Sequence, residues 1–556
     1  MTLADLLAAA RDELGRQRYA EAVALLAPYA AAPAIQSNVL QRYYGEALCR
    51  AGRPHEGIEA LMKALALKVD DSDAHLQLGF ALQALQMPAE AAECFRTVAA
   101  LRPDSVMAQA YLAIGEQKCA SWQHFDANLA ALLAAVRAKQ DGAADEFCVP
   151  FALVGLPHEP ADLLKAAQVS SRFLARGCQP LPRLAARPKA PGEKLRIGYL
   201  SGDFHAHATA ALLVEVLESR DRERFEVLLF SHGVDDGSPL GRRVRQACEK
   251  FVDVSDQDLA GIARRVRAEG VDILVDLKGH TADSHMAALA FRPAPVQAAW
   301  LGFPGTCGAD YVDYIIGDPV VTPLDDAAAY SERIAQLPGC YQPSDTQRPP
   351  TQVLDRAELG LPADAVVLLS ANQVYKITPT VFDTWMEILR RAPRALLWQL
   401  SGGEPADTRL KAEAQRRGIA PERIVIAPKV DMAAHWQRLA AADLALDTWP
   451  CNGHTTTRDV LGAGVPVLTL MGEGFPGRVA ASILQAAGLQ EWVMGDVEAY
   501  VERAVEACER PPARVDATGA YDSTRFAREL EALYLRMWER AATGLPPAAL
   551  PAQVTD

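Results

Sequence analysis

The chain has 556 residues, of which 50% are hydrophobic and 23% charged, an ordinary composition for a soluble globular protein of several domains. Its formal net charge of −14 argues against a general nucleic-acid-binding protein, which needs a basic face. The ten cysteines form no Cys-x-x-Cys pair and no Cys/His cluster at zinc spacing, so we expect reduced thiols and a cytoplasmic protein.

The N-terminal segment predicts a helix and no targeting signal. Residues 1–7 carry Asp5 and no basic stretch, which is typical of an amphipathic helix and not of a signal peptide. No apolar run reaches the length of a membrane span, so we expect no membrane association.

A 34-residue period follows. Leu78-Gly79 lies 34 residues after Tyr44-Gly45, and Leu112-Ala113 lies 34 residues further on. Small residues at these positions allow paired helices to approach closely, and the period indicates tetratricopeptide repeats over residues 1–120. A generic alanine-rich helical bundle is the alternative interpretation.

A helical extension and a proline-rich linker are predicted over residues 121–194, with the linker at 179–192. After it, short β-rich runs alternate with helical stretches, which predicts parallel sheets covered by helices. The predicted strands are 195–200, 225–230, 273–276, 296–301, 314–316, 366–369, 396–400, 424–427, 444–446 and 465–470. A second proline cluster, 342–350, divides this pattern into two doubly wound, Rossmann-like domains, 195–345 and 346–522. A helix from Thr524 to Ala542, within 523–556, closes the chain.

The segment from Thr448 to Leu470 joins an apolar run, a hydroxyl-rich loop and a helix. Free backbone N–H groups and the helix dipole favour an anion at such a helix start. Three consecutive threonines would add hydroxyl donors to a diphosphate: Thr455, Thr456 and Thr457. Asp459 is placed to accept hydrogen bonds from a ribose, whereas Arg458 either contributes or faces solvent. The segment lacks the glycine order of a dinucleotide fingerprint and the lysine of a P-loop, so it predicts another kind of nucleotide-diphosphate site.

The first α/β domain carries histidines at predicted strand ends. His205 and His207 follow the strand 195–200, where an imidazole could take a proton or hydrogen-bond an acceptor. A capping or loop histidine is the alternative for His207. His280 and His285, after Lys278, are not distinguished from solvated loop residues.

The loop 292–308 is dense in proline and glycine. It is interpreted either as backbone brought close to a ligand or as a tight structural crossing.

In the second α/β domain, Lys376 follows a predicted strand and is a candidate counter-charge for phosphate, with a surface lysine as the alternative. His435 and Arg438 share a helix face and could flank a base or phosphate, or form an exposed pair. Asp256-Gln-Asp258 has the letters of a metal-binding motif but is interpreted as a solvated turn or helix cap. No metal is therefore expected, and Lys376 with the helix N-terminus would neutralise the diphosphate.

Four motifs, in this order, resemble the O-linked N-acetylglucosamine transferase family, which includes the SPINDLY-type fucosyltransferases. They are Gly-Asp-Phe-x-x-His, Arg-Pro-Ala-Pro-x-Gln-x-x-Trp-Leu-Gly-x-Pro-Gly-Thr, Asn-Gln-x-Tyr-Lys-Ile and Asp-Thr-x-x-Cys-Asn-Gly-His-Thr-Thr. The resemblance covers residues 195–542, and the repeat region by type. It implies a GT-B fold, in which two Rossmann-like domains face a cleft, and an inverting, metal-independent transfer from a sugar nucleotide to Ser or Thr of a protein.

The resemblance also implies roles for individual residues. His207 corresponds to the acceptor-side histidine that has been argued to act as a base, and Lys376 to the lysine that stabilises the leaving diphosphate. The implied donor contacts are Gln373 and Tyr375 lining the donor site, His435 and Arg438 near the nucleobase, and Cys451, His454, Thr455, Thr456 and Asp459 on the sugar, phosphate and ribose.

The chain departs from the animal enzymes of this family in two ways. The segment 341–354 is short where those enzymes carry a long insertion, and about three complete repeats are visible with Asn38 as their sole asparagine. Presentation of a protein acceptor by the repeats is therefore an open expectation.

The expected activity is transfer of N-acetylglucosamine from UDP-GlcNAc, a substrate, to Ser/Thr hydroxyls of proteins, with no cofactor and no nucleic-acid or membrane partner. One alternative is a GDP-fucose-dependent protein O-fucosyltransferase. Another is a repeat scaffold whose catalytic half binds nucleotide but turns over little. A sugar-nucleotide epimerase is disfavoured by the repeats, and a dehydrogenase by the missing Gly-x-Gly-x-x-Gly fingerprint.

Overall fold

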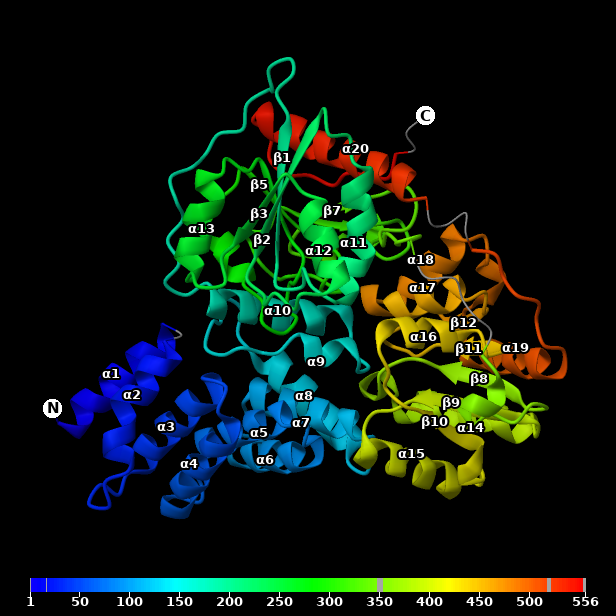
Figure 1. The fold of residues 1–556 in the computed structure, drawn as a ribbon, viewed down its shortest axis with the longest axis horizontal. Helices are drawn as coiled ribbons and strands as arrows, with labels where there is room; N and C mark the ends of the chain where they lie inside the picture. The colour runs from blue at the N-terminus through cyan, green and yellow to red at the C-terminus, as the bar shows by residue number, and fades with distance from the viewer. Residues whose placement is uncertain (1, 17, 348–353, 518–521, 554–556) are drawn as a thin grey trace. The chain divides into compact units, whose positions relative to one another are not determined.

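The computed structural model describes residues 2–16, 18–347, 354–517 and 522–553, and its elements are labelled in Figure 1. The chain forms two compact units, Met1–Ala138 and Lys139–Asp556. The last part of the second proline cluster, residues 348–350, lies outside the described residues.

The first unit is built from paired helices. These are α1 (Leu3–Gly15), α2 (Tyr19–Ala30), α3 (Asn38–Arg50), α4 (Pro54–Leu67), α5 (Ser72–Ala84), α6 (Pro88–Leu101), α7 (Val106–Lys118) and α8 (Phe125–Ala138). The side chains of Ser37, Asp71 and Ser105 cap α3, α5 and α7 at 34-residue intervals. A Cβ at Gly79 would lie 2.5 Å from the ring of Phe95, so the glycine lets α5 and α6 pack closely. The predicted helical repeats are thus confirmed.

The first unit extends to Ala138, beyond the predicted boundary at residue 120, because α8 packs on α7. The Asn128 side chain of α8 donates a hydrogen bond to the buried carboxylate of Glu116 on α7. The segment that follows contains α9 (Phe151–Val154) and α10 (Pro160–Leu174) and belongs to the second unit.

The first lobe of the second unit is a parallel seven-stranded sheet in the order β3-β2-β1-β4-β5-β6-β7. Its strands are β1 (Leu195–Ser201), β2 (Phe225–Ser231), β3 (Lys250–Asp253), β4 (Ile273–Asp276), β5 (Val296–Ala299), β6 (Tyr314–Gly317) and β7 (Arg333–Gln336). Helices α11 (Ala208–Ser219), α12 (Pro239–Gln246) and α13 (Leu259–Ala268) connect the first four strands. The five predicted strands of this lobe are confirmed, whereas β3 and β7 were not predicted. Strand β5 ends before the predicted limit, since Leu301 already has a φ of 70°.

The second lobe repeats this plan with six parallel strands in the order β10-β9-β8-β11-β12-β13. They are β8 (Val366–Ser370), β9 (Ala395–Leu400), β10 (Ile424–Ala427), β11 (Leu444–Leu446), β12 (Val467–Leu470) and β13 (Val493–Met494). Its helices are α14 (Pro379–Arg391), α15 (Glu404–Arg416), α16 (Met432–Leu439), α17 (Thr455–Gly462), α18 (Val479–Ala486) and α19 (Val497–Glu509). The five predicted strands are confirmed, and the two-residue β13 was not predicted. The predicted pair of Rossmann-like domains is therefore correct.

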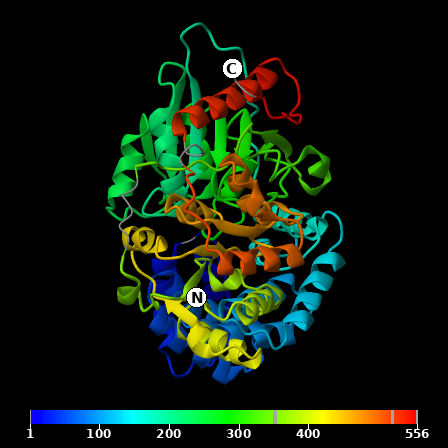
Figure 2. The same cartoon turned by 90° about the vertical axis from the view of Figure 1, so that its right-hand side faces the viewer.

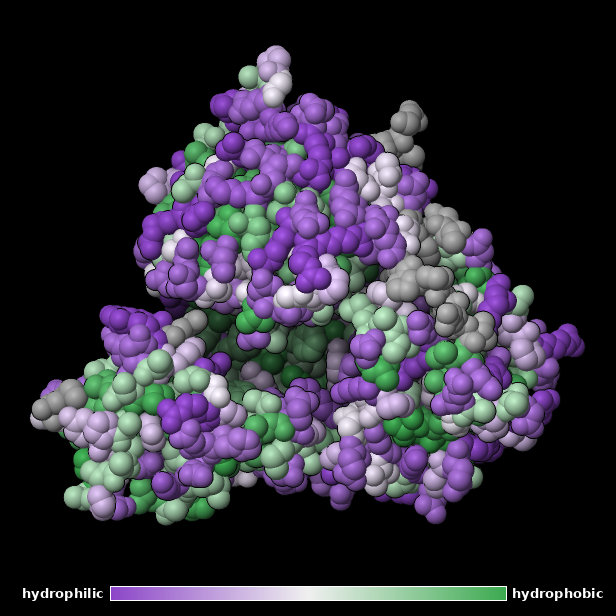
Figure 3. Space-filling model, in the orientation of Figure 1, coloured by the Kyte–Doolittle hydropathy of each residue, from purple (hydrophilic) through white to green (hydrophobic). Residues whose placement is uncertain are grey.

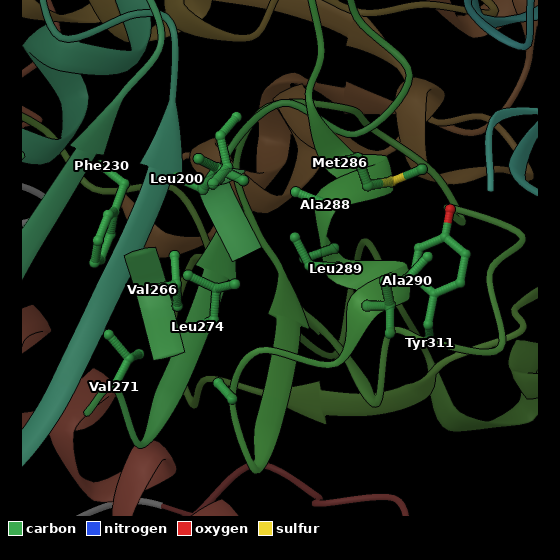
Figure 4. Packing of buried hydrophobic residues seen from close by; sticks show 14 of the residues in the cluster. Leu200, Phe230, Val266, Val271, Leu274, Met286, Ala288, Leu289, Ala290 and Tyr311 are labelled. Atoms are coloured by element: carbon green, nitrogen blue, oxygen red, sulfur yellow. The ribbon is translucent and has the colours of Figure 1, made fainter. Parts of the chain in front are cut away.

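Figure 4 shows the core beneath the first sheet. Side chains from β1, β2, β4 and α13 meet residues of a 3₁₀ helix, η1 (Met286–Phe291), in one buried cluster. Leu200, Phe230, Leu274 and Leu289 are each at most 1% exposed. Burial on both faces explains why these strands read as continuous apolar runs.

The C-terminal helix α20 (Ser523–Ala542) returns to the first lobe. It packs on α11 and β5, and the hydroxyls of Tyr199 and Tyr534 lie 3.0 Å apart. Figures 1 and 2 both show this red helix along the green lobe. The chain therefore passes from the first lobe to the second and back again, and α20 covers part of the first lobe at α11 and β5.

Hydrophilic residues cover most of the first lobe on the face drawn in Figure 3, with apolar residues scattered among them. Among the described residues, none of the helices is both long and apolar enough to cross a membrane.

Candidate active site

Several predicted site residues follow strands that border the point where the strand order of a sheet reverses. In the first lobe the order reverses between β1 and β4, and in the second between β8 and β11. Ligands of open parallel sheets bind outside the carboxyl ends of strands at such points. His207 follows β1, Lys376 follows β8, and the Thr448–Asp459 segment follows β11.

Lys376 ends a short 3₁₀ helix, η4 (Val374–Lys376), and is 8% exposed, so the surface-lysine alternative is wrong. Its Nζ donates a hydrogen bond of 2.6 Å to the backbone carbonyl of Asn452. Burial lowers the pKa of Lys376, but Cys451, Tyr375 and Asp447 raise it more. The ammonium therefore stays charged at neutral pH beside the loop after β11.

We call residues 448–454 the donor loop, because the family resemblance implies that Cys451 and His454 contact the donor. Thr448 Oγ1 donates to the carbonyl of Cys451 at 2.7 Å, and Asn452 Nδ2 donates to the carbonyl of Thr448 at 2.8 Å. Cys451 is 1% exposed, and burial raises the pKa of its thiol, which stays protonated. His454 lies at the end of the loop, with Nε2 3.4 Å from the Pro476 carbonyl, and burial lowers the pKa of His454 to about 3. The side chains of Cys451 and His454 are therefore neutral at physiological pH, and the loop that carries them contacts the charged Lys376.

Helix α17 begins directly after the donor loop. Thr455 and Thr456 are half-buried in its first turn, and Asp459 is half-buried one turn further on. Thr457, the third predicted hydroxyl donor, is instead 2% exposed and donates to the carbonyl of Gly453 at 2.8 Å. Its assignment to the diphosphate is therefore wrong, since its hydroxyl already closes the helix start.

Arg458 is 1% exposed, so the solvent-facing alternative is wrong. Its guanidinium donates to the carbonyl of Gln342, in the segment that follows the first sheet. Arg478, which precedes α18, forms an ion pair of 2.6 Å with Asp326 of the first lobe and so also links the two lobes. Arg458 therefore joins α17 to the first lobe.

Gln373 precedes η4 and Tyr375 lies within it, and the two residues differ in environment. Gln373 is exposed at the start of η4. The Tyr375 ring lies 5.8 Å from that of Phe151 on α9, and a Cβ at Gly155 would lie 3.2 Å from the Tyr375 carbonyl. Tyr375 therefore packs the second lobe against the α9 segment.

His435 and Arg438 form an interacting pair on α16, which packs beside α17. Arg438 is 4% exposed and donates to the Pro428 carbonyl at 2.5 Å and to His435 Nδ1 at 2.9 Å. The exposed-pair alternative is therefore wrong. Since arginine can only donate, Nδ1 of His435 accepts, and the neutral ring carries its proton on Nε2. Burial lowers the pKa of His435 to about 4, so the ring is neutral at physiological pH and offers an N–H donor.

His207 caps α11 in the first lobe, and its Nδ1 accepts a hydrogen bond of 3.2 Å from the backbone N–H of Thr209. A neutral ring held in this way carries its proton on Nε2, so its free nitrogen donates. The capping interpretation is thus confirmed. Burial lowers the pKa of His207, while the Asp203 carboxylate, 3.7 Å from Nδ1, opposes this change.

A buried ion pair lies beside His207. Lys278 Nζ is 3.0 Å from each carboxylate oxygen of Asp203, and both residues are less than 9% exposed. Asp276, at the end of β4, accepts the backbone N–H of Gly279 at 2.5 Å, and burial raises the pKa of Asp276 to about 6. The charge of Lys278 is therefore already compensated within the protein.

The other predicted histidines of the first lobe have separate environments. His205 Nδ1 lies 3.8 Å from Asp236, and the His285 ring lies 4.1 Å from that of His232, tilted by 43°. His280 is 4% exposed and bonded to the Cys307 carbonyl at 2.7 Å, so it is a core residue and not a solvated one.

The loop 292–308 is a structural crossing. A Cβ at Gly302 would lie 2.0 Å from the Leu277 carbonyl oxygen, and one at Gly308 would lie 2.3 Å from the backbone of Ala167. Only glycine permits these approaches, which pack the loop against the end of β4 and against α10, as the structural-crossing interpretation predicts.

Two residues at this site were not predicted, although both open motifs quoted above. Asp447 directly follows β11 and Asn372 follows β8; they are 2% and 3% exposed, and their side chains are hydrogen-bonded at 3.0 Å. A polar residue directly after an apolar strand was the available signal.

Among the described residues, no group of three or more His, Cys, Asp or Glu side chains is placed to hold a metal ion. Asp258 of the Asp-x-Asp sequence caps α13 by accepting the Gly261 N–H at 2.6 Å, which confirms the predicted helix cap.

Comparison with known proteins gives consistent matches. The model of glycosyl transferase family 41 matches residues 183–348 and 343–513. The Arabidopsis thaliana protein named probable UDP-N-acetylglucosamine–peptide N-acetylglucosaminyltransferase SEC is 34% identical over 426 residues, which cover 72% of this chain and 43% of that protein. The Caenorhabditis elegans UDP-N-acetylglucosamine–peptide N-acetylglucosaminyltransferase is 28% identical over 478 residues, covering 64% and 42%.

Among solved structures, a mutant of the Thermobaculum terrenum O-GlcNAc transferase superposes with a TM-score of 0.74 at 28% identity, covering 91% of this chain and 98% of that one. The chain spans less than half the length of the two curated relatives. The family model nevertheless spans both lobes and every candidate residue from His207 to Asp459. The chain therefore belongs to glycosyl transferase family 41.

Proposed function

We propose that this protein transfers N-acetylglucosamine from UDP-GlcNAc to serine and threonine hydroxyls of proteins, with inversion at the sugar carbon and without a metal ion. The observation that carries the proposal is the charged, buried Lys376 beside the start of α17, at the switch point of the second sheet. The names of the relatives support the choice of sugar and acceptor.

The reaction exchanges one bond at the anomeric carbon. The acceptor hydroxyl oxygen attacks C1 of the sugar, the bond from C1 to the β-phosphate oxygen breaks, and its electron pair leaves with UDP. The hydroxyl proton passes to water or to an oxygen of the leaving phosphate as the new C–O bond forms. Negative charge therefore grows on the diphosphate, and groups that meet it there lower the barrier.

The second lobe offers groups for each part of the donor. Lys376 and the free N–H groups of α17 would meet the diphosphate. The carboxylate of Asp459 would accept hydrogen bonds from the ribose. His435, with its proton on Nε2, would donate to a carbonyl oxygen of the base. Cys451 and His454 would contact the sugar, with Thr455 and Thr456 adding hydroxyls. A lysine and a helix start together supply the positive charge that a metal supplies in other sites.

The first lobe would receive the acceptor. His207 lies at the switch point of the first sheet, with Nε2 free to donate to an oxygen there. We infer that the helical repeats present the protein acceptor. Substitutions of exposed residues on α3, α5 and α7 should then slow transfer to a protein more than transfer to a short peptide. Equal effects on both acceptors would count against this presentation.

The proposed donor is tested by calorimetric titration of the purified chain with UDP and GDP, with EDTA present. We expect UDP to bind and Asp459→Ala to weaken binding, because ribose contacts are lost. The exposed residue Lys411 on α15 supplies a matched control, Lys411→Ala. A preference for GDP would replace the proposal by a GDP-fucose-dependent enzyme, and binding of neither would favour the scaffold alternative.

Transfer itself is tested with radiolabelled UDP-GlcNAc and cell lysate as a source of acceptors. Label on serine or threonine of protein, lost in Lys376→Ala, is the expected result. If UDP binds but no acceptor is labelled, the enzyme claim fails while the nucleotide site stands. Free epimerised donor without acceptor would indicate the epimerase alternative.

A further inference from the structure

The Asp447 carboxylate accepts three hydrogen bonds beside the donor loop. It follows the three-residue strand β11 and is 2% exposed. Its Oδ1 accepts the backbone N–H of Gly453 at 2.6 Å and Nδ2 of Asn372 at 3.0 Å. Its Oδ2 accepts the hydroxyl of Thr469, the third residue of β12, at 2.7 Å. One carboxylate thus joins β8, β11 and β12 to the donor loop.

The donor loop lies between this carboxylate and Lys376. Asp447 holds the N–H of Gly453, and Lys376 holds the carbonyl of Asn452, the preceding residue. The backbone N–H of Asn452 bonds the Pro476 carbonyl at 2.9 Å. Consecutive residues of the loop are therefore fixed by three different segments.

The loop also presses against Asp447. A Cβ at Gly453 would lie 3.1 Å from Asp447 Oδ1, 3.3 Å from Asn372 Oδ1 and 2.7 Å from Thr457 Oγ1. No side chain fits there without moving the start of α17, which Thr457 closes. The position of the helix start relative to Lys376 thus depends on the short bond between Gly453 and Asp447.

We propose that Asp447 is the positioning residue of the donor site: through Gly453 it holds the donor loop so that Lys376 and the start of α17 face the same diphosphate. This inference rests on the proposed function, because only the proposed function assigns the sugar-nucleotide donor to this loop. Asp447 lies behind the loop and acts on the donor only through it.

A purely structural carboxylate would behave differently, and the same strand supplies a matched control. Asp443, at the other end of β11, accepts the N–H of Val367 at 2.8 Å and pairs with Arg356 at 2.7 Å. It fixes two strands and an arginine but touches no part of the donor loop. Asp443→Ala should therefore lower thermal stability without altering the loop.

The test compares Asp447→Ala, Asp447→Asn and Asp443→Ala in the full chain. The probes are calorimetric binding of UDP, kcat and KM for UDP-GlcNAc, melting temperature, and hydrogen–deuterium exchange of peptides covering residues 448–458. Asp447→Ala leaves the Gly453 N–H without its acceptor, so we expect faster exchange of these peptides and an increase of about tenfold in the Kd for UDP. Asp443→Ala should leave both within about twofold, whatever its melting temperature.

Asp447→Asn is the conservative rescue. Its oxygen can still accept from Gly453 and Asn372, while the Thr469 hydroxyl turns to accept from the new amide. We expect exchange of 448–458 close to that of the parent and a Kd within about threefold. If Asp447→Ala does not fold, Asp447→Ser replaces it in the test. The serine side chain is too short to bring its oxygen within hydrogen-bond distance of the Gly453 N–H.

Two results would overturn the proposal: parent-like exchange of 448–458 in Asp447→Ala, or equal loss of UDP affinity in Asp447→Ala and Asp443→Ala. Failure of the proposed function is separate, since it shows as absent UDP binding in the parent. The exchange comparison remains decisive for Asp447 in that case, because it needs no nucleotide.

Discussion

Replacement of Lys376 by methionine tests the chemistry of the site most directly. The side chain is 8% exposed, and its Nζ donates a hydrogen bond to the Asn452 carbonyl of the donor loop. Methionine keeps most of the buried length and removes the charge. Donor binding should largely survive, because α17 and Asp459 still hold the diphosphate and ribose.

The expected loss in turnover follows from where the charge acts. A unit charge about 4 Å from a developing oxyanion contributes about 4 kcal/mol at the effective dielectric of a partly buried site. Part of this attraction already exists with bound donor, since UDP-GlcNAc carries negative charge before the bond breaks. The fraction that appears only as the leaving group forms is comparable to that of one oxyanion donor, and predicts a fall in kcat of about 10²- to 10³-fold.

Single-turnover transfer at saturating donor measures this step, and calorimetry with UDP measures binding. We expect the Kd of Lys376→Met to rise by no more than about tenfold while kcat falls by the larger factor. Lys411→Ala, at an exposed position on the same lobe, should match the parent in both. An equal loss in binding and turnover would refute the assignment of Lys376 to the leaving group, since it would then bind ground and transition states alike.

Three further outcomes are expected. His207→Asn should keep the cap on Thr209 and the free energy of unfolding within about 1 kcal/mol, yet slow transfer, because Nε2–H is lost; parent-like kcat would exclude His207 from the reaction. Arg438→Met should raise the Kd for UDP by calorimetry, because methionine cannot donate to Nδ1 and His435 is then no longer held with its proton on Nε2; an unchanged Kd would contradict this. Burial raises the pKa of Asp447 from about 3.8 to about 6, because it disfavours the charged carboxylate. The contribution of Asp447 to the free energy of unfolding is therefore highest below pH 3.8, where Asp447 is protonated, and it falls as the pH rises through 6 and the buried carboxyl ionises. Urea titrations should then show Asp447→Asn gaining roughly 3 kcal/mol on the parent between pH 4 and 7, and no pH-dependent difference would contradict that pKa.

The repeat period and most strands were predictable because each depends on local pattern. The 34-residue spacing of caps and small residues is set within each helix pair. The buried strands of both lobes are continuous apolar runs. Strand β3 was missed because only one of its four positions, from Lys250 to Asp253, is buried, and two are exposed. Strand β13 has only two residues and is defined by its pairing with β12.

Side-chain direction within the site could not be predicted from sequence. Thr455, Thr456 and Thr457 read alike, yet only the third points into the protein, because successive helix positions turn by about 100°. Arg458 follows by the same rotation into the contact with Gln342. The pattern predicted a loop and a helix start, as observed, but it could not separate partly exposed side chains from those that hold the loop.

The two lobes share one local arrangement, and a difference in how its lysine is paired fits the proposed place of the anion. Each sheet places a buried carboxylate beside its switch point, Asp276 at the end of β4 and Asp447 after β11, and burial raises the pKa of both to about 6. Each carboxylate accepts a loop N–H and lies near a buried lysine. Lys278 forms an ion pair with both carboxylate oxygens of Asp203, whereas Lys376 donates a hydrogen bond to a neutral backbone carbonyl. A lysine that donates directly to a carbonyl, with Asp447 acting on it from nearby, can still meet a phosphate, whereas a lysine paired directly with a carboxylate is already neutralised. The same fold can therefore hold a charged donor in its second lobe and a neutral hydroxyl acceptor in its first.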